Sequence, residues 1–291
     1  MPGDKSARRR GALLVLIATV LWSLAGLFAR LLADLDVWTV MGWRALLGAA
    51  SIATVGLIEW RSGRLDSPRG FGALSPLVAL LAMIAISAYT ASVMTTTIAD
   101  VMVIYATLPF VAAAIGFLVN GERVAPRTLI ASGAALAGVI IMVASGLGSG
   151  RLLGQALSML MTLAFAGMIV LQRRQPGASV IVVNCLGAIG SGIFGLANSP
   201  LEPISMHDFA ILFVFGLTTI GLAFVLFMEG AKFIPSAEAG LISLLDVVLG
   251  PVWVFIAFGE NPGLATNHGG AIVLAAAVWR MAPELRQERA S

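Results

Sequence analysis

The sequence predicts an all-α integral membrane protein with ten transmembrane helices, arranged as two inverted five-helix repeats around a central cavity. Hydrophobic residues make up 59% of the 291 residues and charged residues only 11%, whereas a soluble protein carries roughly 25% charged residues. The hydrophobic residues fall into ten blocks, most of them about 20 residues long, the length of a helix that crosses a bilayer. The order of several residues in the first five blocks recurs in the second five.

The ten blocks are the predicted membrane helices. Each block is continuously apolar, whereas the strand of a membrane barrel alternates apolar and polar residues. The blocks run near residues 11–32, 37–58, 73–94, 101–119, 128–144, 154–171, 179–197, 209–228, 237–258 and 265–281. We therefore expect one repeat at residues 1–145 and the inverted repeat at residues 154–291. A linker at residues 146–153, with spaced glycines, joins the two.

The basic residues predict the orientation in the membrane. Fifteen lysines and arginines fall on the same side as the N-terminus, Arg30 and Arg151 fall on the other side, and Arg44 lies within a block. By the positive-inside rule, both termini of this multi-pass protein are cytoplasmic, and we expect it in the cell inner membrane. The net charge of +3 is spread over short clusters between the blocks, which is typical of cytoplasmic loops and not of a surface that binds nucleic acid. The lipid bilayer is the expected partner.

An internal repeat relates the two halves. In the first and sixth blocks, the aligned pairs are Gly11 and Gly154, Thr19 and Thr162, Trp22 and Phe165, Arg30 and Arg173. In the fourth and ninth blocks, they are Ala99 and Ala237, Asp100 and Glu238, Gly121 and Gly259, Glu122 and Glu260, without a gap. Small residues that favour close helix packing recur in the second and seventh blocks, at Ala45, Ala49, Ala53, Gly187, Ser191 and Gly195. Because each half holds an odd number of helices, the second half is inverted, which is typical of secondary transporters.

These residues resemble a known family. Trp22 and Arg44, the run from Asp100 to Glu122 and the run from Glu238 to Glu260 together resemble the drug/metabolite transporter superfamily. Within it, the chain is similar to the ten-helix EamA group and, by general likeness, to the YddG type of aromatic amino acid exporter. The resemblance covers nearly the whole chain. It implies ten helices in two inverted halves, a central cavity and export of small metabolites such as amino acids.

Two charged residues, Arg44 and Asp246, lie inside apolar blocks. At about 1.5 Å per residue, Arg44 lies roughly 10 Å from the outer end of its helix and Asp246 about 14 Å from the inner end of its own, so both fall near the middle of a core about 30 Å thick. A charge at that depth costs roughly 2.5 kcal/mol or more and needs a wet cavity or a partner. Arg44 either captures a substrate carboxylate or ties two helices together through an ion pair or a helix-cap contact. Asp246 either titrates a proton or serves as a satisfied partner, with Arg44 as one candidate for that partner.

Aromatic and hydroxyl side chains are predicted at similar depth. Trp22, Ser23, Tyr89 and Tyr105 are candidates for a substrate-binding wall that stacks on an apolar or aromatic group. The alternative for the two tyrosines is a place in the aromatic belt at the membrane surface. Trp22 lies too deep for the belt.

Four further residues are candidates for gating or hinge motion. Pro109 and Pro251 fall inside the fourth and ninth blocks and each removes a helix hydrogen bond, which produces either a hinge or a fixed bend. Glu229 and Lys232 lie at the inner end of the eighth block. They form either an inner gate or a solvated loop edge.

The sequence does not predict an enzyme, a metal or another cofactor. Cys185 is the single cysteine, and His207 and His268 lack metal-ligand spacing; no phosphate-binding loop is present, which argues against direct use of ATP. The predicted function is a secondary transporter that exports small amphipathic metabolites, in particular amino acids with aromatic or other large apolar side chains, by alternating access. The alternatives are a drug, nucleotide-sugar or other metabolite carrier of the same fold. The last alternative, an intramembrane enzyme, would need several polar groups converging at one depth, such as a histidine with carboxylates, and the sequence shows no such group of residues.

Overall fold

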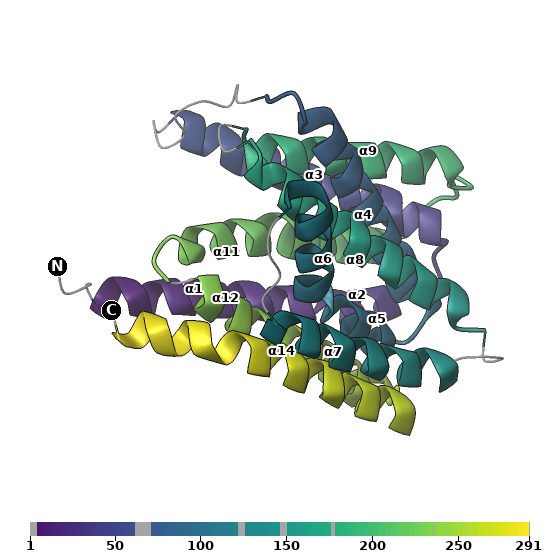
Figure 1. The fold of residues 1–291 in the computed structure, drawn as a ribbon. Coiled ribbons are helices and arrows are strands. Elements are labelled where there is room, and N and C mark those ends of the chain that lie inside the picture. Colours follow the sequence, from purple (N-terminus) through teal and green to yellow (C-terminus); the bar gives the residue numbers. More distant parts are fainter. Residues whose placement is uncertain are drawn as a thin grey trace.

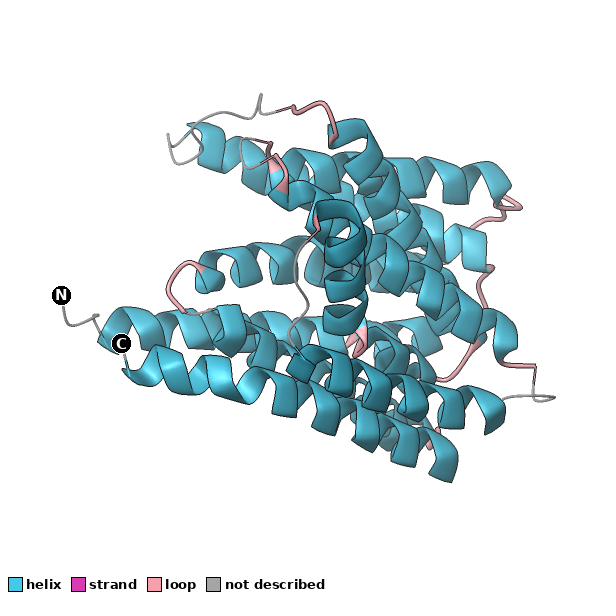
Figure 2. Cartoon of the chain, viewed as in Figure 1, coloured by secondary structure: helices cyan, strands magenta, loops and turns pink. Residues whose placement is uncertain are grey.

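The protein is all-helical wherever its structure is described. The computed structural model describes residues 5–61, 71–121, 126–145, 150–175, 178–234 and 236–290, and these contain no strand (Figure 2). The helices are α1 Lys5–Ser23, α2 Ala25–Leu31, α3 Val37–Arg61, α4 Ser75–Thr95, α5 Ile98–Tyr105, α6 Leu108–Asn120, α7 Pro126–Ser145, α8 Leu152–Arg173, α9 Val180–Asn198, α10 Met206–Phe215, the π-helical segment η1 Gly216–Leu222, α11 Ala223–Ala231, α12 Ser236–Ser243, α13 Leu245–Phe258 and α14 Leu264–Ala290.

The chain is a multi-pass membrane protein. Within the described residues, nine stretches are long and apolar enough to cross a bilayer, at Ser6–Leu31, Val37–Ile58, Ser75–Thr95, Ile98–Val119, Pro126–Ala144, Leu152–Arg173, Val180–Asn198, Met206–Ala231 and Glu238–Phe258. They match the first nine predicted blocks. The tenth predicted block lies within α14, which packs along α7 but is not among the nine. The tenth crossing therefore stays a prediction.

The helices form one bundle with both chain termini at the same end (Figure 1). We call this the terminal end of the bundle and the opposite one the far end. Helix α3 packs against α9 and η1, and α4 packs against α8 and α9. Helix α1 packs against α11, α12 and α13. The middle of α3 therefore faces the π-helical segment, which brings Arg44 next to residues from much later in the sequence.

Three of the membrane stretches are interrupted. Helix α1 gives way to α2 at Leu24, α5 gives way to α6 at Ala106 and Thr107, and α12 gives way to α13 at Leu244. Ala106 and Leu244 occupy equivalent positions in the alignment that pairs Asp100 with Glu238. Interrupted helices leave backbone polar groups available beside a binding site, which is a common arrangement in transporters.

The ends of α6 and α13 are also equivalent. Gly121 follows α6 and Gly259 follows α13, with φ angles of 66° and 67°. Glycine takes this left-handed conformation without steric cost, so it is well suited to end a helix there. Glu122, which the sequence alignment pairs with Glu260, lies outside the described residues, as do residues 146–149 of the predicted linker.

The two prolines occupy different positions in their helices. Pro251 lies inside α13, as predicted. Pro109 was predicted inside a helix but lies in the first turn of α6, directly after the interruption at Thr107. The expectation was wrong because one apolar block contains two helices. In a first turn, the missing N–H of proline removes no helix hydrogen bond.

Candidate functional site

Arg44 is buried in the bundle without a carboxylate partner. Its side chain is 4% exposed, and it takes part in none of the ion pairs found among the described residues. Its Nη1 donates to the hydroxyl of Thr90 at 2.8 Å and its Nη2 to the hydroxyl of Thr219 at 3.3 Å. The Nε atom is buried and makes no hydrogen bond. The guanidinium therefore keeps one buried donor unused.

Two aromatic rings flank the same guanidinium. Its central carbon lies 4.4 Å from the ring centre of Phe215 and 5.3 Å from that of Tyr89. Rings at these distances attract a cation through the negative charge of their faces. Phe215 ends α10 and Tyr89 lies in α4, so the arginine is held between helices from both halves of the sequence.

The π-helical segment supplies the most connected residue of the site, Thr219. Its hydroxyl accepts from Arg44 and donates to the carbonyl of Phe215 at 2.7 Å. Its own carbonyl accepts from the indole N–H of Trp22 at 2.9 Å. A π-helical turn shifts the carbonyl groups out of the normal helix pattern, and such turns often occur at functional sites.

Close helix packing fixes the backbone around Arg44. A Cβ atom added to Gly216 would lie 2.6 Å from the carbonyl oxygen of Arg44 and 3.0 Å from the backbone nitrogen of Gly48. Only glycine permits this approach between α3 and η1. Gly216 of η1, which is not part of the predicted rows of small residues, therefore has a direct effect on the position of the arginine.

Asp246 is the second buried charge predicted for the site. It lies in the first turn of α13 and is 8% exposed. Its Oδ1 atom is buried without a hydrogen-bond partner. The predicted partnership with Arg44 is not formed, because no ion pair joins the two residues. Val247, which follows Asp246 in the sequence, belongs to the buried hydrophobic cluster against which Tyr89 and Tyr105 pack.

The remaining predicted residues form an aromatic side of the same region. The indole of Trp22 lies 5.2 Å from the ring of Phe227, and the hydroxyl of Ser23 accepts from the indole N–H of Trp253 at 2.9 Å. Tyr105 packs 6.3 Å from Phe165. The tyrosines and Trp22 are partly buried inside the bundle rather than exposed on its outer surface.

The predicted gating pair lies apart from this cluster. Lys232 follows α11 and its Nζ donates to the carboxylate of Glu229 at 2.5 Å, in an exposed ion pair at the terminal end. A cavity of about 370 Å³ opens nearby, between α4, α8, α9 and α11. Its polar lining comes from Gln172, Arg173 and Asn184, and none of the predicted substrate-binding residues lines it.

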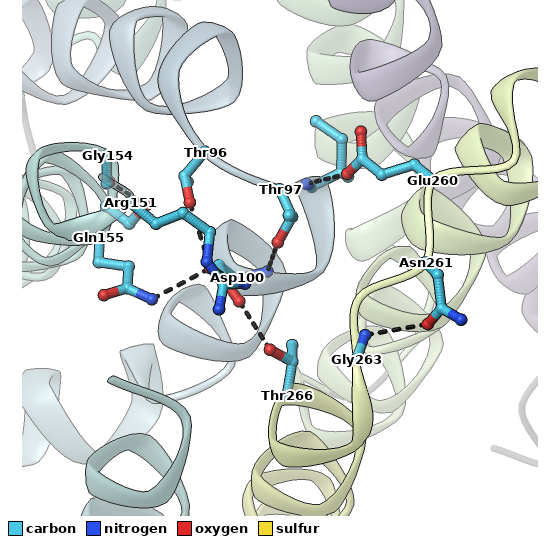
Figure 3. A network of polar contacts seen from close by, with 12 residues as sticks. Thr96, Thr97, Asp100, Arg151, Gly154, Gln155, Glu260, Asn261, Gly263 and Thr266 are labelled. Atoms are coloured by element: carbon cyan, nitrogen blue, oxygen red, sulfur yellow. Dashed lines mark hydrogen bonds and ion pairs between the residues drawn. The ribbon is translucent and has the colours of Figure 1, made fainter. Parts of the chain in front are cut away.

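A buried polar network holds the far end together (Figure 3). Asp100 is 0% exposed. Its Oδ2 accepts from Arg151 at 3.2 Å and from Gln155 at 3.0 Å, and its Oδ1 accepts from Thr266 at 2.9 Å. The hydroxyl of Thr96 also donates to Oδ2, at 3.1 Å. One carboxylate thus joins α5, α8 and α14.

A second ion pair lies at the same end. The Nε of Arg30 donates to Glu260 at 2.6 Å, and its other nitrogens donate to the carbonyls of Val93 and Thr96. Glu260 also accepts from the backbone N–H of Ile98 at 2.9 Å (Figure 3). Arg30 and Glu260 therefore join the ends of α2, α4 and α13 to the start of α5.

The terminal end carries a counterpart of the Asp100 network. Arg8 donates to Glu238 at 2.6 Å, and the sequence alignment pairs Glu238 with Asp100. Both arginines lie close to the start of the first helix of a half, Arg8 in α1 and Arg151 directly before α8. The side chain of Arg8 is 47% exposed, whereas that of its counterpart Arg151 is 24% exposed.

Sequence reasoning missed Thr219, Phe215 and Trp253 as parts of the site. A threonine or phenylalanine inside an apolar block carries no signal of its own. Their roles depend on the π-helical turn and on contacts between residues far apart in sequence, such as Arg44 and Thr219, which are 175 residues apart.

The fold defines a multi-pass helical membrane protein with a buried polar cluster around Arg44. The EamA-like transporter family matches residues 9–144 and again residues 152–281. The chain belongs to this family, with two copies of its domain, and is therefore a membrane transporter of the drug/metabolite type.

Solved structures share the fold, and 19 chains among them match. One crystal structure, described only as that of a protein, aligns with 97% of this chain and 99% of its own chain. The TM-score is 0.67 and the sequence identity 16%. No curated protein matches the sequence.

Proposed function

We propose that this protein is a secondary transporter that exports small amphipathic metabolites, in particular amino acids with an aromatic or other large apolar side chain, by alternating access. The observation that carries the proposal is the state of Arg44. It is a buried guanidinium that contacts two hydroxyls and two rings but no carboxylate. Family membership supports transport, and the residues around Arg44 support the substrate class.

Arg30, which joins several helix ends, has a carboxylate partner in Glu260, whereas Arg44 takes part in none of the ion pairs among the described residues. A buried charge without an opposite charge is costly in a membrane. The carboxylate of a substrate would offset that cost, because the planar guanidinium donates two parallel hydrogen bonds to it. The Nε of Arg44, which has no partner, is one of the donors available for this.

The surrounding rings support an aromatic or large apolar substrate side chain. Trp22, Tyr89 and Phe215 come from three different helices and each contacts Arg44 or Thr219. Tyr105 packs against the same hydrophobic cluster as Tyr89. Aromatic pairs contribute roughly 0.5–1.5 kcal/mol beyond the area that they bury. The general likeness to the YddG type of exporter favours the same substrate class.

The arrangement of ion pairs supports alternating access. We propose that the far end is the outer end and the terminal end is cytoplasmic, as the basic residues predict. The outer end is closed by the Asp100 network and by the pair of Arg30 with Glu260. The cytoplasmic end carries exposed pairs and the cavity beside Arg173. The contrast between the more buried ion pairs at the far end and the exposed ones at the terminal end supports an outer side that is closed in this structure.

The two halves would exchange these roles during transport. The matched pairs Arg8 with Glu238 and Arg151 with Asp100 support ten crossings in two inverted repeats, with residues 1–145 and 154–291 as the units. Inverted repeats can adopt each other's conformations, which opens the site first on one side and then on the other. Pro251, inside α13, is a candidate hinge for this motion. The interruption between α5 and α6, directly before Pro109, is a second candidate hinge.

A nucleotide sugar is the less favoured substrate. Its diphosphate calls for several cations, because each phosphate group is bound best by arginine or lysine. Arg44 is the one basic side chain that is buried among the described residues. A single guanidinium suits one carboxylate.

Transport by purified protein in liposomes tests the substrate class. The vesicles are loaded in turn with phenylalanine, leucine, glutamate, a nucleotide sugar and a cationic drug, and the rate of exit is measured for each. We expect exit of phenylalanine and leucine above protein-free vesicles. Exit of the drug or the nucleotide sugar, with no movement of any amino acid, would replace the proposed substrate class.

A further inference from the structure

We infer that the cavity at the terminal end is a second binding site, a loading site in which Arg173 binds the carboxylate of the substrate before the molecule reaches Arg44. The inference rests on the proposed function and deepens it, because it adds a site outside the buried cluster and names the side from which the substrate arrives. The observation behind it is a cavity of about 370 Å³ whose lining combines one arginine with apolar side chains.

The lining of the cavity suits a small amphipathic anion. Most of it is apolar and comes from Val78, Met168, Ile169, Ala178, Val180 and Met228. Among the described residues that line the cavity, Arg173 alone is charged. Sites for small molecules are commonly cavities of about 300–1,000 Å³, with apolar walls and a few polar groups that fix the orientation of the ligand. The volume lies near the lower end of that range, which suits a small metabolite and not the two acyl chains of a phospholipid.

Arg173 is available to a ligand, unlike its counterpart in the repeat, Arg30. The alignment of the two halves pairs these two arginines, at the ends of α8 and α2. Arg30 binds Glu260 and the carbonyls of Val93 and Thr96. Arg173 is exposed and takes part in none of the ion pairs among the described residues. The same position in the repeat therefore ties helices together at the far end and presents a free guanidinium at the terminal end.

Asn184 of α9 supplies a second polar contact to the loading site. Its Nδ2 donates to the carbonyl of Val180 at 2.9 Å. A side-chain amide has two N–H donors and an acceptor oxygen, so this bond leaves further capacity for the polar groups of a ligand. Gln172 instead holds the connection between α8 and α9, because its Nε2 donates to the carbonyl of Ala178 at 2.8 Å.

The loading site is separate from Arg44 but shares two helix stretches with it. Helices α8 and α9 pack against α4, whereas α11 packs against α1 and η1 (Figure 1), and the cavity lies between these groups. Met228 of α11 follows Thr219 by nine residues, and Val78 of α4 precedes Thr90 by twelve. At about 1.5 Å per residue, the cavity lies roughly 14–18 Å from the threonines that bind Arg44. A single amino acid cannot span that distance, so two sites are needed.

Protection of a thiol in the cavity tests the loading site in the full-length protein. The single cysteine is removed by Cys185→Ala, and Met228→Cys then places one thiol in the lining. The rate of labelling by a thiol reagent is measured with increasing L-phenylalanine or phenylalanine amide, which lacks the carboxylate. We expect phenylalanine to slow the labelling and the amide to have little effect. In the control, Lys232→Cys places the thiol at the same end but outside the lining, and its labelling should not change.

Three arginine variants locate the contact. In the background with a thiol at position 228, Arg173→Gln should raise the phenylalanine concentration for half protection about fivefold, the upper end of what an exposed ion pair contributes. Arg44→Gln should leave that concentration unchanged, since it alters only the distant site. Arg174→Gln is the matched control, because Arg174 donates to the carbonyl of Val119 and does not line the cavity. Elution as a single species and thermal unfolding establish that each variant is folded.

The outcomes separate this inference from the proposed function. Protection that disappears in Arg44→Gln would come from binding at the central site, and equal protection by the amide would remove the role of the carboxylate. Either result, or an unchanged half-protecting concentration in folded Arg173→Gln, would overturn the inference, while exit of phenylalanine from liposomes would still support export. If phenylalanine neither protects the thiol nor leaves the liposomes, both the loading site and the proposed substrate class are wrong.

Discussion

Arg30 and Glu260 form an ion pair of 2.6 Å although 230 residues separate them in the sequence. The pair joins the end of α2 to the residues that follow α13, and both side chains reach further. Arg30 binds the carbonyls of Val93 and Thr96, and Glu260 binds the N–H of Ile98. Four helix ends therefore meet at one pair of charges. In the proposed transport cycle, this contact has to break whenever the far end opens.

Glu260→Gln should loosen the far end of the bundle. The amide loses the charge that holds Arg30, and exposed or partly exposed ion pairs of this kind contribute roughly 0.2–1 kcal/mol. We expect faster hydrogen–deuterium exchange in the backbone from Val93 to Asp100 and little change elsewhere. Glu229→Gln is the matched control, because its ion pair with Lys232 is exposed at the other end. Unchanged exchange in Glu260→Gln would show that the pair does not close this end.

Asp100→Ala should destabilise the protein far more than Glu238→Ala. Removal of the Asp100 carboxylate leaves the donors of Gln155 and Thr266 buried without an acceptor, at about 1–3 kcal/mol for each such group. Glu238 is the sequence counterpart but pairs with the exposed Arg8, which water can solvate. Thermal unfolding in detergent measures the difference as a lower Tm for Asp100→Ala. Equal Tm values for the two variants would contradict the structural role of the network.

Gly216→Ala should displace Arg44. The added methyl group would come 2.6 Å from the carbonyl oxygen of Arg44, and overpacking of this kind costs roughly 1–3 kcal/mol. Both Tm and phenylalanine affinity should fall. Gly250→Ala is the matched control, since its Cβ would meet the nearest atoms at an ordinary 3.5 Å. If the two variants behave alike, the close approach of α3 and η1 does not set the position of the arginine.

Thr219→Val should weaken substrate binding without unfolding the protein. Valine has the shape of threonine but lacks the hydroxyl that accepts from Arg44, and a hydrogen bond to a charged group contributes about 1.5 kcal/mol, or roughly tenfold in affinity, at the lower end of its range. Thr219→Ser keeps the hydroxyl and should bind phenylalanine as the wild type does. A loss of the same size in the serine variant would assign the effect to packing of the methyl group.

The overall class of the fold follows from sequence because membrane helices depend on local composition. The first nine predicted blocks correspond to the nine apolar stretches among the described residues, and the matches of Gly121 with Gly259 and of Ala106 with Leu244 agree with the predicted repeat. The helix interruptions were harder to predict. Leu24 and Leu244 are apolar residues in apolar runs, and only Pro109 gave a local sign of a break.

The candidate site could be predicted only in part. Arg44 and Asp246 stand out because a charge in an apolar block is rare, and both are buried. Their partners are set by tertiary packing. Thr90 and Thr219 contact Arg44 because α4 and η1 lie on either side of it. A single sequence does not indicate which helices pack against each other. The pairing of Arg44 with Asp246, one of the alternatives that the sequence leaves open, is not formed among the described residues.

The most direct test of the central claim is the rate of phenylalanine exit from liposomes that contain equal amounts of wild-type protein or Arg44→Lys. Lysine keeps the positive charge but lacks the planar guanidinium that donates two parallel hydrogen bonds to a carboxylate. If Arg44 binds the substrate carboxylate, exit should slow about tenfold or more in the variant, as expected for the loss of a hydrogen bond to a charged group. Exit at the wild-type rate from folded Arg44→Lys would contradict the account.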